Sequence, residues 1–242
     1  VGELIGELKA REELDNTLVI VSGDHGMPGM PRGKCNLHDF GSRVSLLVSW
    51  PARVKPGRRI DDFVSLMDIA PTVLETTDIA RPDHMLAESF LDLLTSEKGG
   101  VIDKTRDHVI IGRERHVGEA RTDRTPYPSR AIRTSNFMLI RNFKPNRMPM
   151  GDVFKSEATA EQLLQDHYLA YPDMDASPTK VFLMTNRDAY PKHFDIAFSA
   201  RPEFELYDLK RDPDQVDNIA ADPNYADVLR KLTDRMMSEL RE

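Results

Sequence analysis

The spacing of apolar residues in the first hundred positions switches between the period of a helix and that of a strand. Two runs rich in β-branched residues are typical of buried strands, and a parallel sheet is expected for the first of them. Other segments repeat apolar residues every three or four positions, as amphipathic helices do. The strands are predicted at 17–21 and 44–50, and the helices at 1–14, 67–74 and 87–94. Pro71 falls within the second helical pattern, so it is expected in that helix's first turn.

From residue 105 onward the pattern becomes that of short antiparallel strands. A polar turn at Ser135 and Asn136 joins two of them into a predicted hairpin. Strands are predicted at 109–111, 129–134, 137–142 and 204–207, and an amphipathic helix at 225–240. Residues 145–199 have weak periodicity and are predicted to form long loops with one helix near 160–168. The sequence therefore predicts an α/β domain at 1–104 and a smaller subdomain at 105–242, an antiparallel sheet with a closing C-terminal helix.

Composition limits the classes of protein to which the chain can belong. Its 242 residues are 40% hydrophobic and 30% charged, which is typical of a folded globular protein. The net charge of -7 gives no general basic surface for nucleic acid, so an anionic ligand would need a local basic pocket. The single cysteine, Cys35, excludes an internal disulfide, and no apolar run reaches the length of a membrane helix. No signal peptide is visible at Val1, and the chain opens inside a helical pattern, so further sequence is expected upstream.

Asp24 and His25 follow the first predicted strand at its C-terminal end, where α/β sheets commonly bind ligands. A carboxylate and an imidazole placed side by side can both bind a metal ion. The alternative is a capped turn in which Asp24 accepts hydrogen bonds from backbone amides and Gly26 takes a positive φ. Two ligands do not complete a metal site, and the sequence leaves both interpretations open.

Two further segments carry residues suited to anion chemistry. In residues 33–43, Lys34 could neutralise an anion and His38 could transfer a proton, unless this is simply a solvated loop. Residues 113–116 place Arg115 and His116 in an arginine-rich stretch that could bind sulfate or phosphate, or could form surface ion pairs with nearby acids. Cys35 is expected to be a small packed residue rather than a nucleophile.

Taken together, these segments resemble the sulfatase family, and the resemblance covers most of the chain in the family's order. Residues 16–26 resemble the family's strand leading to a metal-binding Asp-Asn or Asp-His pair. Residues 33–34 and 41–51 resemble the segment that holds the sulfate-contacting lysine and the next core strand. The helix and C-terminal signatures of the family are resembled by residues 65–74, 205–209, 212–213 and 218–220. Residues 36–37, 127–130 and 141–143 are similar to those of heparan N-sulfatases, and 113–116 to bacterial relatives of that group.

The resemblance implies an alkaline-phosphatase-like fold, in which residues 1–104 form the C-terminal part of a sheet sandwiched by helices. It implies metal-dependent hydrolysis of a sulfate ester or sulfamate on a sugar. Asp24 and His25 would then bind the metal, Lys34 would contact the sulfate, and His38 is a candidate for protonating the leaving group. Arg115 and His116 would face the sugar. Exported location (periplasmic, extracellular or lysosomal) and a role in glycosaminoglycan degradation are further implications.

Two departures from the family pattern matter. The family's nucleophile is a formylglycine made within a Cys/Ser-x-Pro-x-Arg motif, and this sequence has no such motif. The expectation is that the nucleophile and further metal ligands lie in an N-terminal part of the same protein, and that this chain alone is inactive. The resemblance implies Ca²⁺, whereas His25, which stands where many sulfatases carry Asn, leaves zinc or manganese open. A phosphodiesterase or phosphonate hydrolase of the same superfamily and a non-catalytic module that binds sulfated glycans are the alternatives.

Overall fold

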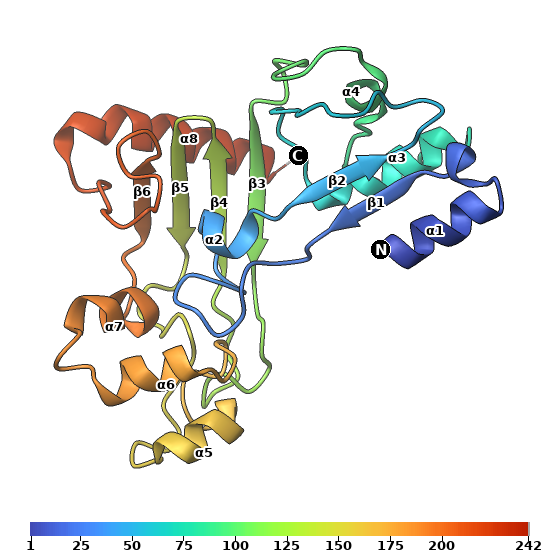
Figure 1. Cartoon of the computed structure of the whole chain (residues 1–242). Helices are drawn as coiled ribbons and strands as arrows, with labels where there is room; N and C mark the ends of the chain where they lie inside the picture. The colour runs from blue at the N-terminus through green and yellow to red at the C-terminus, as the bar shows by residue number, and fades with distance from the viewer. Residues whose placement is uncertain (242) are drawn as a thin grey trace. The chain divides into compact units, whose positions relative to one another are not determined.

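The computed structural model describes residues 1–241. Contacts among them group the chain into two compact units, shown as ribbons in Figure 1. Unit 1 holds residues 1–23 and 45–109, and unit 2 holds residues 24–44 and the chain from residue 110 onward. The segment with the candidate residues Asp24, His25, Lys34 and His38 therefore packs with the C-terminal half of the chain. The predicted domain boundary after residue 104 remains a prediction.

Unit 1 contains one pair of strands and several short helices. Its elements are α1 (Gly2–Ala10), η1 (Leu14–Asn16), β1 (Val19–Ser22), β2 (Leu46–Ser49), η2 (Leu66–Asp68), α3 (Ile69–Thr76) and α4 (Leu91–Thr95). The predicted strands and helices are all present, with bounds that differ by a few residues. Pro71 is the third residue of α3, in its first turn as expected. Phe90, Leu93 and Leu94 form the core of this unit, against which Leu46 and Val48 of β2 pack.

The expectation of a parallel sheet at β1 is wrong for the pair that the structure contains. β1 and β2 are antiparallel, with Val19 opposite Ser49 and Ser22 opposite Leu46. A parallel partner requires the chain to return to the sheet end at which the first strand began. Here the chain returns at the end where β1 finishes, as shown by the hydrogen bond of 3.3 Å from the Gly23 amide to the Ser45 carbonyl. The pair is also less buried than predicted, and Leu47 on its outer face is 61% exposed.

Unit 2 is built on a four-stranded sheet in the order β3-β4-β5-β6 (Figure 1). Neighbours β4 and β5, and β5 and β6, are antiparallel, with Ala131 opposite Ile140 and Leu139 opposite Leu206. The elements are α2 (Asp39–Ser42), β3 (His108–Arg113), β4 (Ser129–Thr134), β5 (Phe137–Asn142), α5 (Ala160–Gln165), η3 (His167–Leu169), α6 (Pro178–Thr185), α7 (Pro191–Phe198), β6 (Phe204–Asp208), η4 (Pro223–Tyr225) and α8 (Ala226–Glu239). The predicted hairpin and the closing C-terminal helix are confirmed.

The two faces of this sheet have different covers, because successive side chains of a strand point to opposite sides. Ile132, Leu139 and Leu206 point to one face and pack with residues of α8, including Met236. The intervening strand positions point to the other face, where their buried side chains form a second cluster with Leu37 of residues 24–44. These strand residues are Ala131, Met138, Ile140 and Tyr207. Residues 24–44 therefore pack on the face opposite α8. We call this segment the site loop.

The remaining helices of unit 2 form a group of their own, and the sequence predicted only part of it. α5 was expected, but α6 and α7 lie in a region predicted to be loop. Each is only eight residues long and starts with a proline, so neither shows an extended helical period. Their apolar side chains form a cluster with Met150, Tyr171 and Met174, and Cys35 of the site loop packs against it.

Candidate functional site

The site loop is folded tightly on itself, and its glycines make this possible. A Cβ atom on Gly26 would lie 1.9 Å from the Phe40 carbonyl oxygen, and one on Gly33 would lie 2.1 Å from that of Met27. On Gly41 the corresponding distance, to the Gly33 oxygen, would be 2.4 Å. No side chain fits at these distances, so the backbone itself fills the loop. Its polar side chains are consequently held in defined positions by a compact backbone.

Asp24 and His25 lie at the start of the site loop, and their side chains approach each other. His25 Nδ1 lies 2.8 Å from the Gly26 carbonyl oxygen. A carbonyl oxygen can only accept, so Nδ1 donates in this contact. The other ring nitrogen, Nε2, lies 3.4 Å from Asp24 Oδ2, and the Asp24 side chain is 88% exposed. The pair thus presents one imidazole nitrogen and one carboxylate oxygen to the same region.

Lys34 forms an ion pair that the sequence did not predict. Its Nζ lies 3.2 Å from Asp175 Oδ2, and the two side chains are 25% and 35% exposed. His116 lies close enough to feel the charges of both residues and of Asp173, while partial burial is the main cause that lowers its pKa. Lys34 and His116, two of the predicted site residues, therefore lie within electrostatic range of each other. Arg115, the neighbour of His116, is exposed.

Two arginines near the site are used internally rather than for ligand binding. Arg113 Nη2 donates to Asp173 Oδ2 at 2.9 Å, and Arg121 Nη2 donates to the same oxygen at 3.1 Å. The other carboxylate oxygen accepts from the Val117 amide at 2.9 Å, and the Asp173 side chain has no exposed surface. The aromatic ring of Tyr127 faces both guanidinium groups, and its centroid lies 5.3 Å from Arg113 Cζ and 5.5 Å from Arg121 Cζ. This buried ion cluster ties the segment after β3 to residues 173–175.

His38 is fully buried and belongs to a hydrogen-bonded group on the sheet face. Its Nε2 lies 3.3 Å from the Tyr207 hydroxyl, which donates to Glu205 Oε2 at 2.8 Å. Burial lowers the pKa of His38 to about 4, despite its contact with Glu205. For Glu205, burial acts to raise the pKa, but the hydrogen bond from His38 and the charge of Arg201 outweigh it and hold the pKa below its usual range. The group is therefore a neutral imidazole beside an ionised carboxylate.

Cys35 is packed, as expected from the sequence. Burial raises the pKa of its thiol to about 11. The Sγ atom donates to the Asp173 carbonyl oxygen at 2.8 Å. A protonated, hydrogen-bonded thiol is a poor nucleophile at neutral pH.

Sequence reasoning missed Asp173 and Asp175, which lie in the region expected to be loop. One local signal was present: Ser177 followed by Pro178 is a helix start, since serine caps and proline fits the first turn. Ser177 does cap α6, accepting from the Lys180 amide. Nothing local indicates that Asp175 lies beside Lys34, because the contact joins distant parts of the sequence. Among residues 1–241, no group of three or more His, Cys, Asp or Glu side chains is placed to hold a metal ion.

The fold of the chain matches that of solved hydrolase structures. A solved structure in complex with its substrate D-glucosamine-2-N,6-O-disulfate matches 99% of this chain with a TM-score of 0.66 at 20% identity. A phosphonate monoester hydrolase of Agrobacterium radiobacter matches 98% with a TM-score of 0.61 at 19% identity. The chain covers 37% of each of those two chains. At such identities the likeness shows the fold, which is that of the alkaline-phosphatase-like hydrolases, including the sulfatases.

The sequence comparisons identify the family within that class. Residues 33–156, just over half of the chain, match the model of N-sulphoglucosamine sulphohydrolase, C-terminal. The chain belongs to this family and is a C-terminal sulfatase portion. The human N-sulphoglucosamine sulphohydrolase is 29% identical over 98% of this chain. An ulvan-active sulfatase of Formosa agariphila is 26% identical over 94% of it. The chain spans 44% and 38% of the lengths of these two relatives.

Proposed function

We propose that the full-length protein containing this chain hydrolyses a sulfate ester or sulfamate on a sugar. The observation that carries the proposal is the set of charged and metal-binding residue types on the site loop of a chain that belongs to the sulfohydrolase family. This loop carries Lys34, whose charge reaches His116, and at its start it carries the donor pair Asp24 and His25. Lys34 would pair with the sulfate, because an ammonium group is a strong partner for an anionic oxygen. Arg115 and His116 would face the sugar.

The donor pair fits a divalent metal ion. Donors about 2.0 to 2.6 Å from an ion and at right angles to each other lie roughly 3 to 3.5 Å apart. The 3.4 Å between His25 Nε2 and Asp24 Oδ2 falls in that range. The hydrogen bond from Nδ1 to the Gly26 carbonyl fixes the tautomer that a metal-bound histidine needs. Calcium, zinc or manganese would supply positive charge for the transferring sulfate oxygens.

The remaining parts of the reaction are proposed to come from upstream. We infer that a formylglycine nucleophile and further metal ligands belong to the N-terminal part of the same protein. Unit 1 has a surface suited to such a partner, since α1 buries none of its side chains and Leu4 is 70% exposed. A sulfated glycan is the proposed substrate and export the proposed location. One relative, from Drosophila melanogaster, is named an extracellular sulfatase. Among residues 1–241, no helix is long and apolar enough to span a membrane.

His38 receives a different proposal from the one that the sequence suggested. A proton donor to the leaving group must reach the substrate, whereas His38 is 1% exposed and contacts Tyr207 and Glu205. Its pKa of about 4 also leaves it without a transferable second proton at neutral pH. We propose that His38 anchors the site loop to the sheet and that Lys34, four positions earlier, is the member of this loop that meets the substrate.

A panel of substrates tests the proposed function. The full gene product would be assayed for anion release from glucosamine N-sulfate, O-sulfated sugars, a phosphate diester and a phosphonate monoester. Release of sulfate with little release of phosphate or phosphonate is expected. Preferential release from the phosphorus compounds would favour the second candidate, a phosphonate or phosphodiester hydrolase. That candidate is supported by His25, whose imidazole suits zinc better than an amide oxygen would. Binding of the sugars without any release would indicate a non-catalytic module.

A further inference from the structure

The ion pair between Lys34 and Asp175 poses a physical problem for a sulfate site. Lys34 Nζ and Asp175 Oδ2 are 3.2 Å apart, and neither side chain is fully buried. A carboxylate this close to the proposed sulfate-binding ammonium offsets its charge and repels a bound sulfate. A site that only had to attract sulfate would be better without it. The position of Asp175 therefore needs an explanation in terms of the ligand.

Asp175 is presented by a segment that is fixed on both sides, so the pair is not a chance contact of flexible surface side chains. Two residues earlier, Asp173 is held by Arg113, Arg121 and the Val117 amide. Two residues later, the Ser177 hydroxyl donates to the Gly29 carbonyl of the site loop at 2.6 Å.

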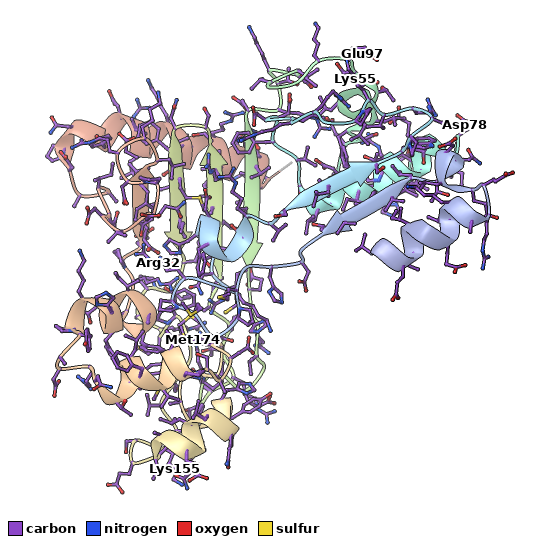
Figure 2. The ribbon with its side chains drawn as sticks, viewed as in Figure 1. Arg32, Lys55, Asp78, Glu97, Lys155 and Met174 are labelled. Atoms are coloured by element: carbon purple, nitrogen blue, oxygen red, sulfur yellow. The ribbon has the colours of Figure 1, made fainter. Side chains whose placement is uncertain are left out.

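Lys180 fixes the same segment through hydrogen bonds to its backbone. Its side chain is fully buried, and its Nζ donates to the carbonyl oxygens of Tyr171 at 3.0 Å and Met174 at 2.7 Å. Figure 2 marks Met174 in this segment and Arg32 in the site loop. Both the loop that carries Lys34 and the segment that carries Asp175 are therefore preorganised.

A ligand profits from this arrangement if it carries a hydrogen-bond donor directly beside its sulfonate group. A carboxylate only accepts hydrogen bonds, whereas an ammonium only donates. In a sugar N-sulfate the bridging atom is an N–H, which can donate to Asp175 while the sulfonate oxygens accept from Lys34. In a sugar O-sulfate the bridging atom is an oxygen without hydrogen, so the carboxylate finds no partner there and its repulsion remains.

We propose that Asp175 is a specificity-determining residue that accepts a hydrogen bond from the bridging nitrogen of a sugar N-sulfate. The inference rests on the proposed function and deepens it by assigning one residue to the discrimination between N-sulfate and O-sulfate. Hydrolysis breaks the N–S bond: R–NH–SO₃⁻ and H₂O give R–NH₃⁺ and SO₄²⁻. The ammonium product is a cation, which the Asp175 carboxylate stabilises as Lys34 stabilises the sulfate.

Two sugars that differ only at the bridging atom test this proposal in the full gene product. Glucosamine 2-N-sulfate and glucose 2-O-sulfate would be compared for wild type and Asp175→Ala, the second as a competitive inhibitor if its turnover is too slow. Loss of one charge-assisted hydrogen bond is expected to lower kcat/KM for the N-sulfate about ten- to a hundredfold. The O-sulfate should be unchanged or handled better. Asp175→Asn, which keeps a neutral acceptor, should recover part of the N-sulfate activity.

Inorganic sulfate supplies a readout of opposite sign. Because the variant lacks the repelling carboxylate, sulfate should inhibit Asp175→Ala more strongly than wild type, which a damaged site would not do. Asp188→Ala is a matched change at a fully exposed side chain between α6 and α7. It should leave the N-sulfate activity, the response to the O-sulfate and the inhibition by inorganic sulfate unchanged. Equal losses on both sugars, or no change on either, would overturn the role of Asp175 alone. A wild type that releases sulfate from neither sugar would remove the proposed function and this role with it.

Discussion

Asp173 and Asp175 stand two positions apart, and their surroundings give them different tasks. Asp173 has no exposed surface and is bound by two guanidinium groups, whereas Asp175 is partly exposed beside Lys34. Residue type alone does not distinguish them. What separates them is the number of buried donors that each carboxylate satisfies, and this depends on contacts distant in sequence. A buried carboxylate with all its partners inside the protein acts on stability, and a half-exposed one remains available to a ligand.

Substitution of Asp173 should therefore destabilise the protein. Asp173→Asn leaves Arg113 and Arg121, which are almost fully buried, without a negative partner. Removing one member of a buried ion cluster costs about 3 to 5 kcal/mol. Urea unfolding of the full gene product would measure the loss, with the exposed Asp188→Asn as the control. A loss below about 1 kcal/mol for Asp173→Asn would show that the two arginines are satisfied by their carbonyl partners alone.

His38 and Glu205 predict how stability depends on pH. An unfolded histidine binds a proton near pH 6.5, but His38 in the fold does so only near its pKa of about 4. As the pH falls between these values, the unfolded state takes up a proton that the folded state does not, so stability decreases by ~3 kcal/mol. Glu205, whose pKa is lowered in the fold, adds to the loss at the acidic end of this window. Stability from His38 is thus fully present above about pH 6.5 and falls toward pH 4.

The variant His38→Gln isolates this contribution, because glutamine keeps a polar group near Tyr207 and does not titrate. Free energies of unfolding measured from pH 7 to pH 4 should decrease less steeply for the variant than for wild type. Parallel curves for the two proteins would show that the imidazole does not titrate as its burial implies.

At the scale of elements, the site loop depends on backbone contacts that only glycine permits. Gly26 donates from its amide to the Gly41 carbonyl at 2.9 Å, and an added Cβ would lie 2.8 Å from the Gly41 Cα. The loop crosses itself here, between Lys34 and the proposed metal ligands Asp24 and His25. Local geometry at this crossing therefore controls the position of the candidate residues without contributing a side chain.

Gly26→Ala should for this reason disturb both fold and site. The methyl group would overlap the Phe40 carbonyl oxygen, so the loop must open, at a cost of about 2 to 4 kcal/mol. Gly118→Ala is the matched control, because an added Cβ there meets nothing within 4 Å. Thermal unfolding and sulfate release would be measured for both variants. Equal behaviour of the two alanines would contradict the crossing.

At the scale of the whole molecule, the sequence predicted elements better than contacts between them. The hairpin at 129–142 and the helix α8 were predicted because period-2 and period-3.6 patterns are local properties. The antiparallel pairing of β1 with β2 was not, because it depends on where the chain re-enters the sheet at Ser45. α6 and α7 were too short to show a period, although the Ser177-Pro178 start was visible.

The candidate site follows the same rule. Lys34 and His116 were proposed from residue type and from the family resemblance, and their site roles stay predictions. Asp175 was not found, since its link to Lys34 exists only in the folded chain. His38 was predicted to transfer a proton because sequence does not report burial, and burial decides its pKa.

The measurement that tests the account most directly is sulfate release by the full gene product with Lys34 replaced by alanine. Lys155→Ala is the control, an exposed lysine ahead of α5 that Figure 2 labels. If Lys34 holds the transferring sulfate, kcat/KM for glucosamine N-sulfate should fall about a hundredfold or more, since preorganised charge contacts contribute several kcal/mol. The control should keep wild-type activity. A Lys34→Ala variant that releases sulfate as fast as wild type would place the sulfate elsewhere and contradict the site proposed for this loop.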